Sequence, residues 1–145
     1  MKNRYIFGML CLMTGLLALY GTAIAHGTEK HGKAAAADVQ MKKLHAMMPM
    51  FSLASAELET ALEKGNIASV EAEAGKILAA LPDLKKSKPH KNVNQRKKFV
   101  ALAANLESAT TSTVDFARKG DLNGAKAAFK KVEEACAACH AKFRD

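Results

Sequence analysis

The sequence has little of what β-rich, nucleic-acid-binding or catalytic proteins need. It shows neither the alternation of apolar and polar residues nor the turn pairs that indicate strands and hairpins, which excludes a β-rich fold. Tryptophan is absent and aromatic residues make up 6% of the chain. The 22 lysines and arginines are therefore hardly interleaved with aromatic side chains, and they do not indicate nucleic-acid binding. No nucleophile is paired with a general base, so we do not expect an enzyme.

Cysteine is also scarce, but its placement is the most informative feature of the chain. Two of the three cysteines stand in the run Cys136-Ala137-Ala138-Cys139-His140, a C-x-x-C-H motif of the kind that attaches c-type haem. On a helix, thiols three positions apart lie on one turn and can form thioether bonds to the two vinyl groups of one porphyrin. His140 lies one turn beyond Cys136, where its imidazole can ligate the iron. The motif therefore predicts one haem c per chain, with Cys136 and Cys139 as attachment residues and His140 as the proximal iron ligand.

A C-x-x-C pair has other interpretations. A thioredoxin-like redox pair needs a strand–helix context, which this sequence lacks. A zinc site needs two further ligands at matching spacing, and the third cysteine, Cys11, lies in a segment that we expect to be removed. A simple dithiol or disulfide pair stays open as the alternative to haem attachment.

The first 25 residues have the three parts of a secretory signal peptide. Lys2 and Arg4 supply the charge, residues 6–20 are apolar, and residues 23–25, Ala-Ile-Ala, form a cleavage site. A transmembrane anchor is the alternative, but this apolar run is shorter than the roughly 20 residues that span a bilayer. We therefore predict cleavage after Ala25, no membrane span afterwards, and a periplasmic location in a Gram-negative bacterium. Export agrees with haem attachment, which in bacteria takes place outside the cytoplasm.

Cleavage would leave residues 26–145, enough for one domain with a single core. This part has 20 basic and 14 acidic residues, a net charge of +6, so an acidic protein partner is a reasonable hypothesis. We predict that residues 26–36 form a flexible N-terminal segment and that residues 37–145 form a four-helix haem-binding domain.

Four segments place apolar residues in steps of three and four, which predicts helices over about 38–64, 67–82, 93–119 and 122–143. We expect Pro49 to kink or divide the first helix and Pro82 to end the second. A basic connection would follow Pro82, with His90 exposed in it. The four apolar stripes are Met41, Leu44, Met48, Phe51, Ser55, Leu58 and Leu62; Ile67, Val70, Ala74, Ile77 and Leu81; Phe99, Leu102, Leu106, Ala109, Thr113 and Phe116; and Leu122, Ala125, Phe129, Val132, Cys136, Cys139, His140 and Phe143.

Two segments repeat one pattern of helix end, glycine, cap residue and aliphatic residue. Gly65 is followed by Asn66, and Gly120 is followed by Asp121. Glycine ends helices and Asn or Asp begins them, so both segments predict tight turns between antiparallel helices. Together these observations predict an all-α, up-down-up-down antiparallel four-helix bundle.

The arrangement of the predicted helices and the last residues of the chain resemble those of a known protein family. A four-helix bundle that closes with C-A-A-C-H-A-K-F-R, residues 136–144, resembles the class II c-type cytochromes, the cytochrome c-prime family, whose chains end in C-x-x-C-H-x-x-[YF]-R. The resemblance implies thioethers at Cys136 and Cys139, a proximal His140, and an Arg144 that contacts a haem propionate. From the residues alone, Arg144 is equally an exposed cation favoured by the helix dipole. The chain departs from the family at Pro49 and in its Lys-rich connection.

The family contains two kinds of haem site, which differ in the residue at the sixth iron position. A strong ligand there gives a low-spin haem suited to electron transfer, whereas an apolar shield leaves a five-coordinate iron that binds NO or CO. We predict a single-electron carrier with redox protein partners, and gas binding is the alternative. The resemblance also leaves a homodimer open as an alternative to a monomer.

The position of the sixth iron ligand along the first helix can be estimated by counting residues from the two glycine turns. His140 lies 20 residues after Gly120, so the same level on an antiparallel first helix lies 20 residues before Gly65, near His45. One turn either way gives a window of residues 41–49, within a helix rich in methionine. We predict Met48 as the distal iron ligand. Three other residues in the window are alternatives: Met41, Met47 and His45.

Overall fold

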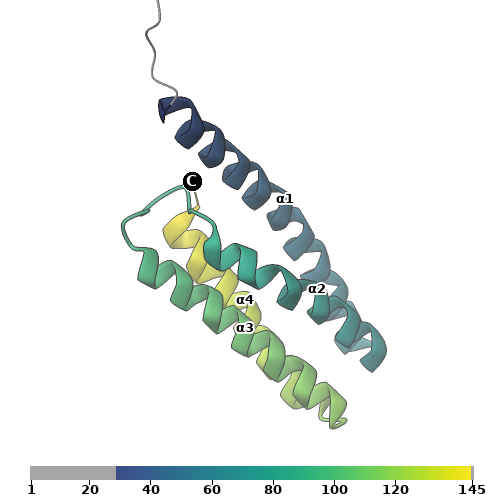
Figure 1. Cartoon of the computed structure of the whole chain (residues 1–145). Coiled ribbons are helices and arrows are strands. Elements are labelled where there is room, and N and C mark those ends of the chain that lie inside the picture. Colours follow the sequence, from purple (N-terminus) through teal and green to yellow (C-terminus); the bar gives the residue numbers. More distant parts are fainter. Residues whose placement is uncertain (1–28, 145) are drawn as a thin grey trace, which may run out of the picture.

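The protein consists of four α-helices, in a computed structural model that describes residues 29–144 and their side chains from Val39 onward. The helices are α1 (Glu29–Glu63), α2 (Ile67–Lys86), α3 (Arg96–Arg118) and α4 (Leu122–Phe143). α1 and α2 form one antiparallel hairpin, α3 and α4 form the other, and α2 packs on α3 (Figure 1). No strand occurs within residues 29–144. The predicted all-α four-helix bundle is confirmed.

Both predicted glycine turns are present, and both have the same backbone hydrogen bonds. Gly65 and Gly120 have φ angles of 64° and 76°, in the left-handed region that glycine adopts without steric cost. The N–H of the residue after each glycine donates back to the last helical turn, from Asn66 to Ala61 O at 2.9 Å and from Asp121 to Phe116 O at 3.0 Å. This is the Schellman arrangement, which satisfies carbonyls at a helix end.

The residues that follow the glycines begin the next helices. Asn66 Oδ1 accepts from Ser69 N at 3.1 Å and Asp121 Oδ1 accepts from Gly124 N at 2.8 Å. Each side chain thereby satisfies one of the unpaired N–H groups at a helix start. The two hairpins are thus closed by local chemistry that is independent of the packing between them.

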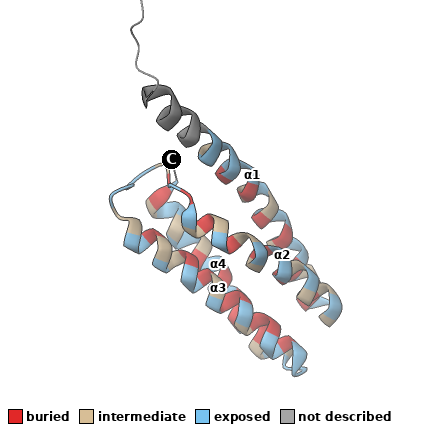
Figure 2. Ribbon diagram, in the orientation of Figure 1, coloured by how far each residue is buried: buried red, intermediate tan, exposed pale blue. Residues whose placement is uncertain are grey.

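The end of the bundle that holds the glycine turns has the most completely buried core. Figure 2 shows buried residues along the faces that the helices turn toward one another. The buried Thr110 and Thr113 hydroxyls donate to the carbonyls of Leu106 and Ala109, so neither hydroxyl lacks a hydrogen-bond partner. The largest side chains with almost no exposure are Leu58, Leu62, Val70, Ile77, Leu81, Thr110, Thr113 and Val132.

The first helix differs from the predicted one in two respects. α1 begins at Glu29 and not near residue 38, so residues 29–36 belong to the helix rather than to a separate N-terminal segment. The four alanines at 34–37 explain the extension, because alanine has the highest helix propensity. Pro49 lies inside α1 and does not divide it. The predicted signal peptide and residues 26–28 lie outside the described residues.

The second helix passes the proline at which we expected it to end. Pro82 lies inside α2, which continues to Lys86. Leu84 is 5% exposed and extends the buried stripe one step beyond Leu81, so packing offsets the loss of one backbone hydrogen bond in the last turn. The helix ends at Ser87, whose N–H donates to Asp83 O and Leu84 O, both at 3.0 Å.

The connection of residues 87–95 is anchored to the end of α4. Lys91 N donates to Phe143 O at 3.2 Å, and Asn92 Nδ2 donates to Lys142 O at 2.7 Å. The Arg96 guanidinium donates to the carbonyls of Ser87 and Lys85. Asn92 has a φ of 54°, and α3 begins at Arg96, three residues later than predicted. The connection therefore lies next to the C-x-x-C-H motif.

One residue of the predicted stripe on the third helix is not in the core. Phe116 is 38% exposed, whereas Ala117 is 1% exposed and Val114 is 7% exposed. The stripe therefore ends one position later than predicted, because the real period of 3.6 residues moves the buried face along the helix. No helix in the described part of the chain is long and apolar enough to cross a membrane.

Candidate functional site

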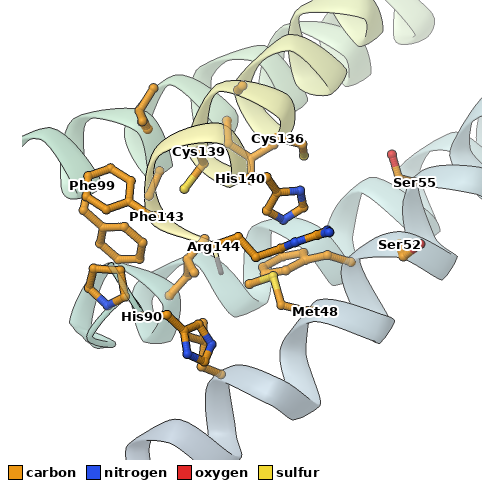
Figure 3. A pocket seen from close by; sticks show the side chains of 18 of the residues that line it. Met48, Ser52, Ser55, His90, Phe99, Cys136, Cys139, His140, Phe143 and Arg144 are labelled. Atoms are coloured by element: carbon orange, nitrogen blue, oxygen red, sulfur yellow. The ribbon is translucent and has the colours of Figure 1, made fainter. Parts of the chain in front are cut away.

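A pocket lies at the end of the bundle opposite the glycine turns, and all four helices contribute to it (Figure 3). Its volume is about 340 Å³. The C-x-x-C-H motif forms one side, and the middle of α1 forms another. The lining residues are Leu44, Met48, Phe51, Ser52, Ser55, Leu84, Pro89, His90, Phe99, Leu102, Ala103, Leu106, Glu133, Ala135, Cys136, Cys139, His140, Phe143 and Arg144.

The two cysteines are half-buried on α4 and carry free thiols. Both pack against the hydrophobic core as well as lining the pocket. Burial raises the pKa of the Cys136 thiol, and the nearby Glu133 carboxylate raises it further. Burial also raises the pKa of Cys139, with Cys136 adding to the effect. Both side chains are therefore held as neutral thiols at the pocket wall.

His140 lies in the last turn of α4, and its side chain is exposed at the mouth of the pocket. Figure 3 shows its imidazole on the same side of α4 as the two cysteines, projecting into the space that Met48 enters from α1. The motif thus presents two thiols and one imidazole to a single cavity, as its spacing predicted.

The floor of the pocket is aromatic. Phe99 of α3 and Phe143 of α4 are each 3% exposed, and their rings meet edge to face at 82° with centroids 5.3 Å apart. This is a favoured geometry for an aromatic pair. Phe143 is the aromatic residue of the C-A-A-C-H-A-K-F-R ending, so that ending contributes packing as well as thiols and an imidazole.

The four candidates for a distal iron ligand all lie on α1, and they differ in whether their side chains line the pocket. Met48 is half-buried and lines the pocket. Met47 is 8% exposed but does not line the pocket. Met41 and His45 also lie outside the lining, and His45 is exposed on the helix surface. Of the four candidates, only Met48 has a side chain that lines the pocket.

Two residues of the pocket were not expected from the sequence. His90 was predicted to be exposed, yet it is half-buried and lines the pocket from the α2–α3 connection. Ser52 lines the pocket from α1; it falls one turn after Met48, a spacing that could have indicated its place. Nothing in the sequence near His90 indicates its position, because that position depends on where the connection is anchored.

Arg144 follows α4 and lines the pocket from its open side. Its N–H donates to His140 O at 3.1 Å, and Figure 3 shows its side chain beside the His140 imidazole. The residue is exposed. Its position is compatible both with a contact to an acidic group of a bound cofactor and with a cation at a helix C-terminus.

These residues fit a haem. The thiols and the imidazole are the groups that attach a porphyrin and ligate its iron, and the remaining walls are mostly aliphatic and aromatic. Within the residues that the structure describes, no group of three or more His, Cys, Asp or Glu side chains could hold a metal ion by itself. The fold and the pocket thus have the features expected of a four-helix c-type cytochrome.

Comparisons with known proteins show which family the chain is similar to. Residues 83–144 match the family described as Cytochrome C'. The crystal structure of cytochrome c' from Thermochromatium tepidum is similar, with a TM-score of 0.60 and 25% identity over 74% of this chain and 95% of that chain. A search of curated proteins found no match. The family match and the structural neighbour support the assignment to the class II c-type cytochromes, the cytochrome c-prime family, whose cofactor is covalently attached haem c.

Proposed function

We propose that the chain is a periplasmic mono-haem cytochrome that carries single electrons. Cys136 and Cys139 would hold the haem by thioether bonds, and His140 would be the proximal iron ligand. The observation that carries this proposal is the convergence of both thiols and the imidazole on one pocket with aromatic and aliphatic walls. The bound haem would supply the redox chemistry, and the chain would position it and exclude water.

Met48 would be the distal ligand. A thioether ligand gives a low-spin haem of raised potential, which is suited to electron transfer because the coordination need not change with oxidation state. Of the four residues considered for this position, Met48 is the one whose side chain lines the pocket. It also enters from the helix that runs antiparallel to α4, across the cavity from His140 (Figure 3).

A five-coordinate haem that binds NO or CO is the second candidate function. Leu44 and Phe51 line the same wall one turn to either side of Met48. They are apolar side chains of the kind that would shield a sixth position without ligating it. Met48 would then act only as packing beside the ring.

The charge around the pocket favours an acidic protein partner. Lys88, Lys91 and Arg144 are exposed next to the site, and Lys142 is half-exposed. A second hollow beside His140 is lined by three of these four residues, Lys91, Lys142 and Arg144. Basic residues near an exposed cofactor edge would steer an acidic redox partner to it, so the association rate should fall as salt is added. A homodimer would instead use the exposed Val39 and Leu53 of α1, and sedimentation analysis distinguishes it from a monomer.

The test combines mass and optical spectroscopy on protein matured in a host that attaches c-type haem. We expect the mass of the chain from residue 26 plus one haem, and a low-spin ferric spectrum with a weak charge-transfer band in the near-red. Met48→Ala should remove that band and make the haem high-spin. Met47→Ala is the matched control, because Met47 is buried in the same turn but lies outside the pocket.

Each result discriminates between the proposals. A mass equal to the bare chain would overturn haem attachment. A wild-type protein that is already high-spin and binds CO would support gas binding instead of electron transfer. An unchanged low-spin spectrum in Met48→Ala would assign the sixth position to another residue.

A further inference from the structure

Two histidines far apart in the sequence meet at the surface between α1 and the α2–α3 connection. A hydrogen bond joins the Nε2 atoms of His45 and His90, which lie 3.2 Å apart. The ring centroids are 5.1 Å apart and the ring planes differ by 20°. Because the Nε2 atoms are closer than the centroids, the imidazoles meet at their Nε2 edges, the edges that bind metals.

The separation of the two nitrogens is also one at which both could ligate a zinc ion in place of their hydrogen bond. Zinc lies about 2.0–2.1 Å from imidazole nitrogens and prefers tetrahedral angles. An ion about 2.0 Å from both Nε2 atoms would subtend an N–Zn–N angle of about 105° between them, close to tetrahedral. Adjacent ligands of a square-planar Cu²⁺ would need nitrogens only about 2.8 Å apart. The observed distance therefore suits Zn²⁺ and is too long for adjacent ligands of square-planar Cu²⁺.

Both histidines are held on anchored backbone. His45 lies within α1. His90 follows the buried Pro89, and the next two residues are hydrogen-bonded to the end of α4 through Lys91 N to Phe143 O and Asn92 Nδ2 to Lys142 O. Zinc binding would thus order little additional chain, which lowers its entropic cost.

We propose that His45 and His90 form a Zn²⁺ site that joins α1 to the α2–α3 connection. The two imidazoles provide two ligands and water completes the coordination, since no third His, Cys, Asp or Glu joins the pair in the described part of the chain. The site shares His90 with the lining of the haem pocket but includes neither the haem thiols nor the proximal imidazole. His45 lies one turn before Met48 on α1, so bound zinc would link the part of α1 that carries Met48 to the connection that carries His90.

The test is isothermal titration of the haem-loaded chain from residue 26 with zinc chloride at neutral pH. We expect one site, and in His45→Ala and His90→Ala separately an affinity that is lower by about tenfold or more. The matched control is a double variant, His26→Ala with His31→Ala, because these two histidines are the other candidates for binding zinc and their side chains lie outside the described residues. This control should keep the site.

Haem absorption and far-UV circular dichroism identify any variant that has not folded. A crystal grown with zinc provides a measurement without mutation, in which anomalous scattering should place the ion between the two Nε2 atoms. Binding that is unchanged in both single variants, binding that is lost only in the His26 and His31 control, or an anomalous peak elsewhere would each overturn the proposal.

Discussion

Replacing Leu58 by alanine tests whether α1 is anchored in the core as the structure indicates. Leu58 has no exposed surface and lies on α1 toward the glycine-turn end, outside the haem pocket. The substitution removes three carbon atoms, worth about 0.8 kcal/mol each when buried. The cavity left behind adds to this, so we expect a loss of about 3–4 kcal/mol in the free energy of unfolding.

Leu53→Ala is the matched control. Leu53 lies on the same helix but is 64% exposed, so the same chemical change should alter the free energy of unfolding by less than about 0.5 kcal/mol. Urea unfolding of the haem-loaded proteins, followed by far-UV circular dichroism, measures both values. The haem absorption spectrum should be unchanged in both variants, because neither residue lines the pocket. Similar losses in the two variants would refute the burial pattern of α1.

Two further predictions concern the helix cap and the thiols. Asp121→Ala should reduce the free energy of unfolding by about 1 kcal/mol, because it removes the acceptor for Gly124 N. Asp121→Asn keeps an acceptor, so equal losses in the two variants would contradict the capping role. In the haem-free, reduced protein, Cys136 and Cys139 should react with iodoacetamide more slowly at pH 8 than a peptide of the same motif, because their raised pKa values leave less thiolate. The fold favours the neutral thiols, so their stabilising contribution is present below the ordinary thiol pKa and is lost as the pH rises through the raised values; a reaction rate equal to that of the peptide would contradict this.

Local sequence determined the hairpins and the chemistry of the motif. Gly65 and Gly120 are needed where φ is positive, and Asn66 and Asp121 supply the caps, so these turns could be predicted from a few neighbouring residues. The C-x-x-C-H spacing places its thiols and imidazole on one side of any helix. Both features depend on interactions within about one helical turn, which the order of residues defines directly.

The ends of the helices and the last residues of the buried stripes depend on packing between helices more than on neighbouring residues in the chain. Pro82 should have ended α2, but the burial of Leu84 against the other helices extends it. Phe116 belongs to the expected stripe on α3, but Ala117 occupies the core in its place. These outcomes depend on the packing energy of a few side chains. That energy outweighs local helix propensity, and no sequence pattern indicates where it does so.

Only the tertiary structure brought His90 to the pocket and separated Met48 from Met41. Both methionines lie on the apolar stripe read from the sequence, and their order in the chain does not show that Met48 alone of the two lines the cavity. The position of His90 depends on hydrogen bonds between the α2–α3 connection and the end of α4, some 50 residues later in the chain. Sequence patterns report contacts within a helix, whereas the rotation of a helix about its axis and the course of a connection are set by contacts between helices.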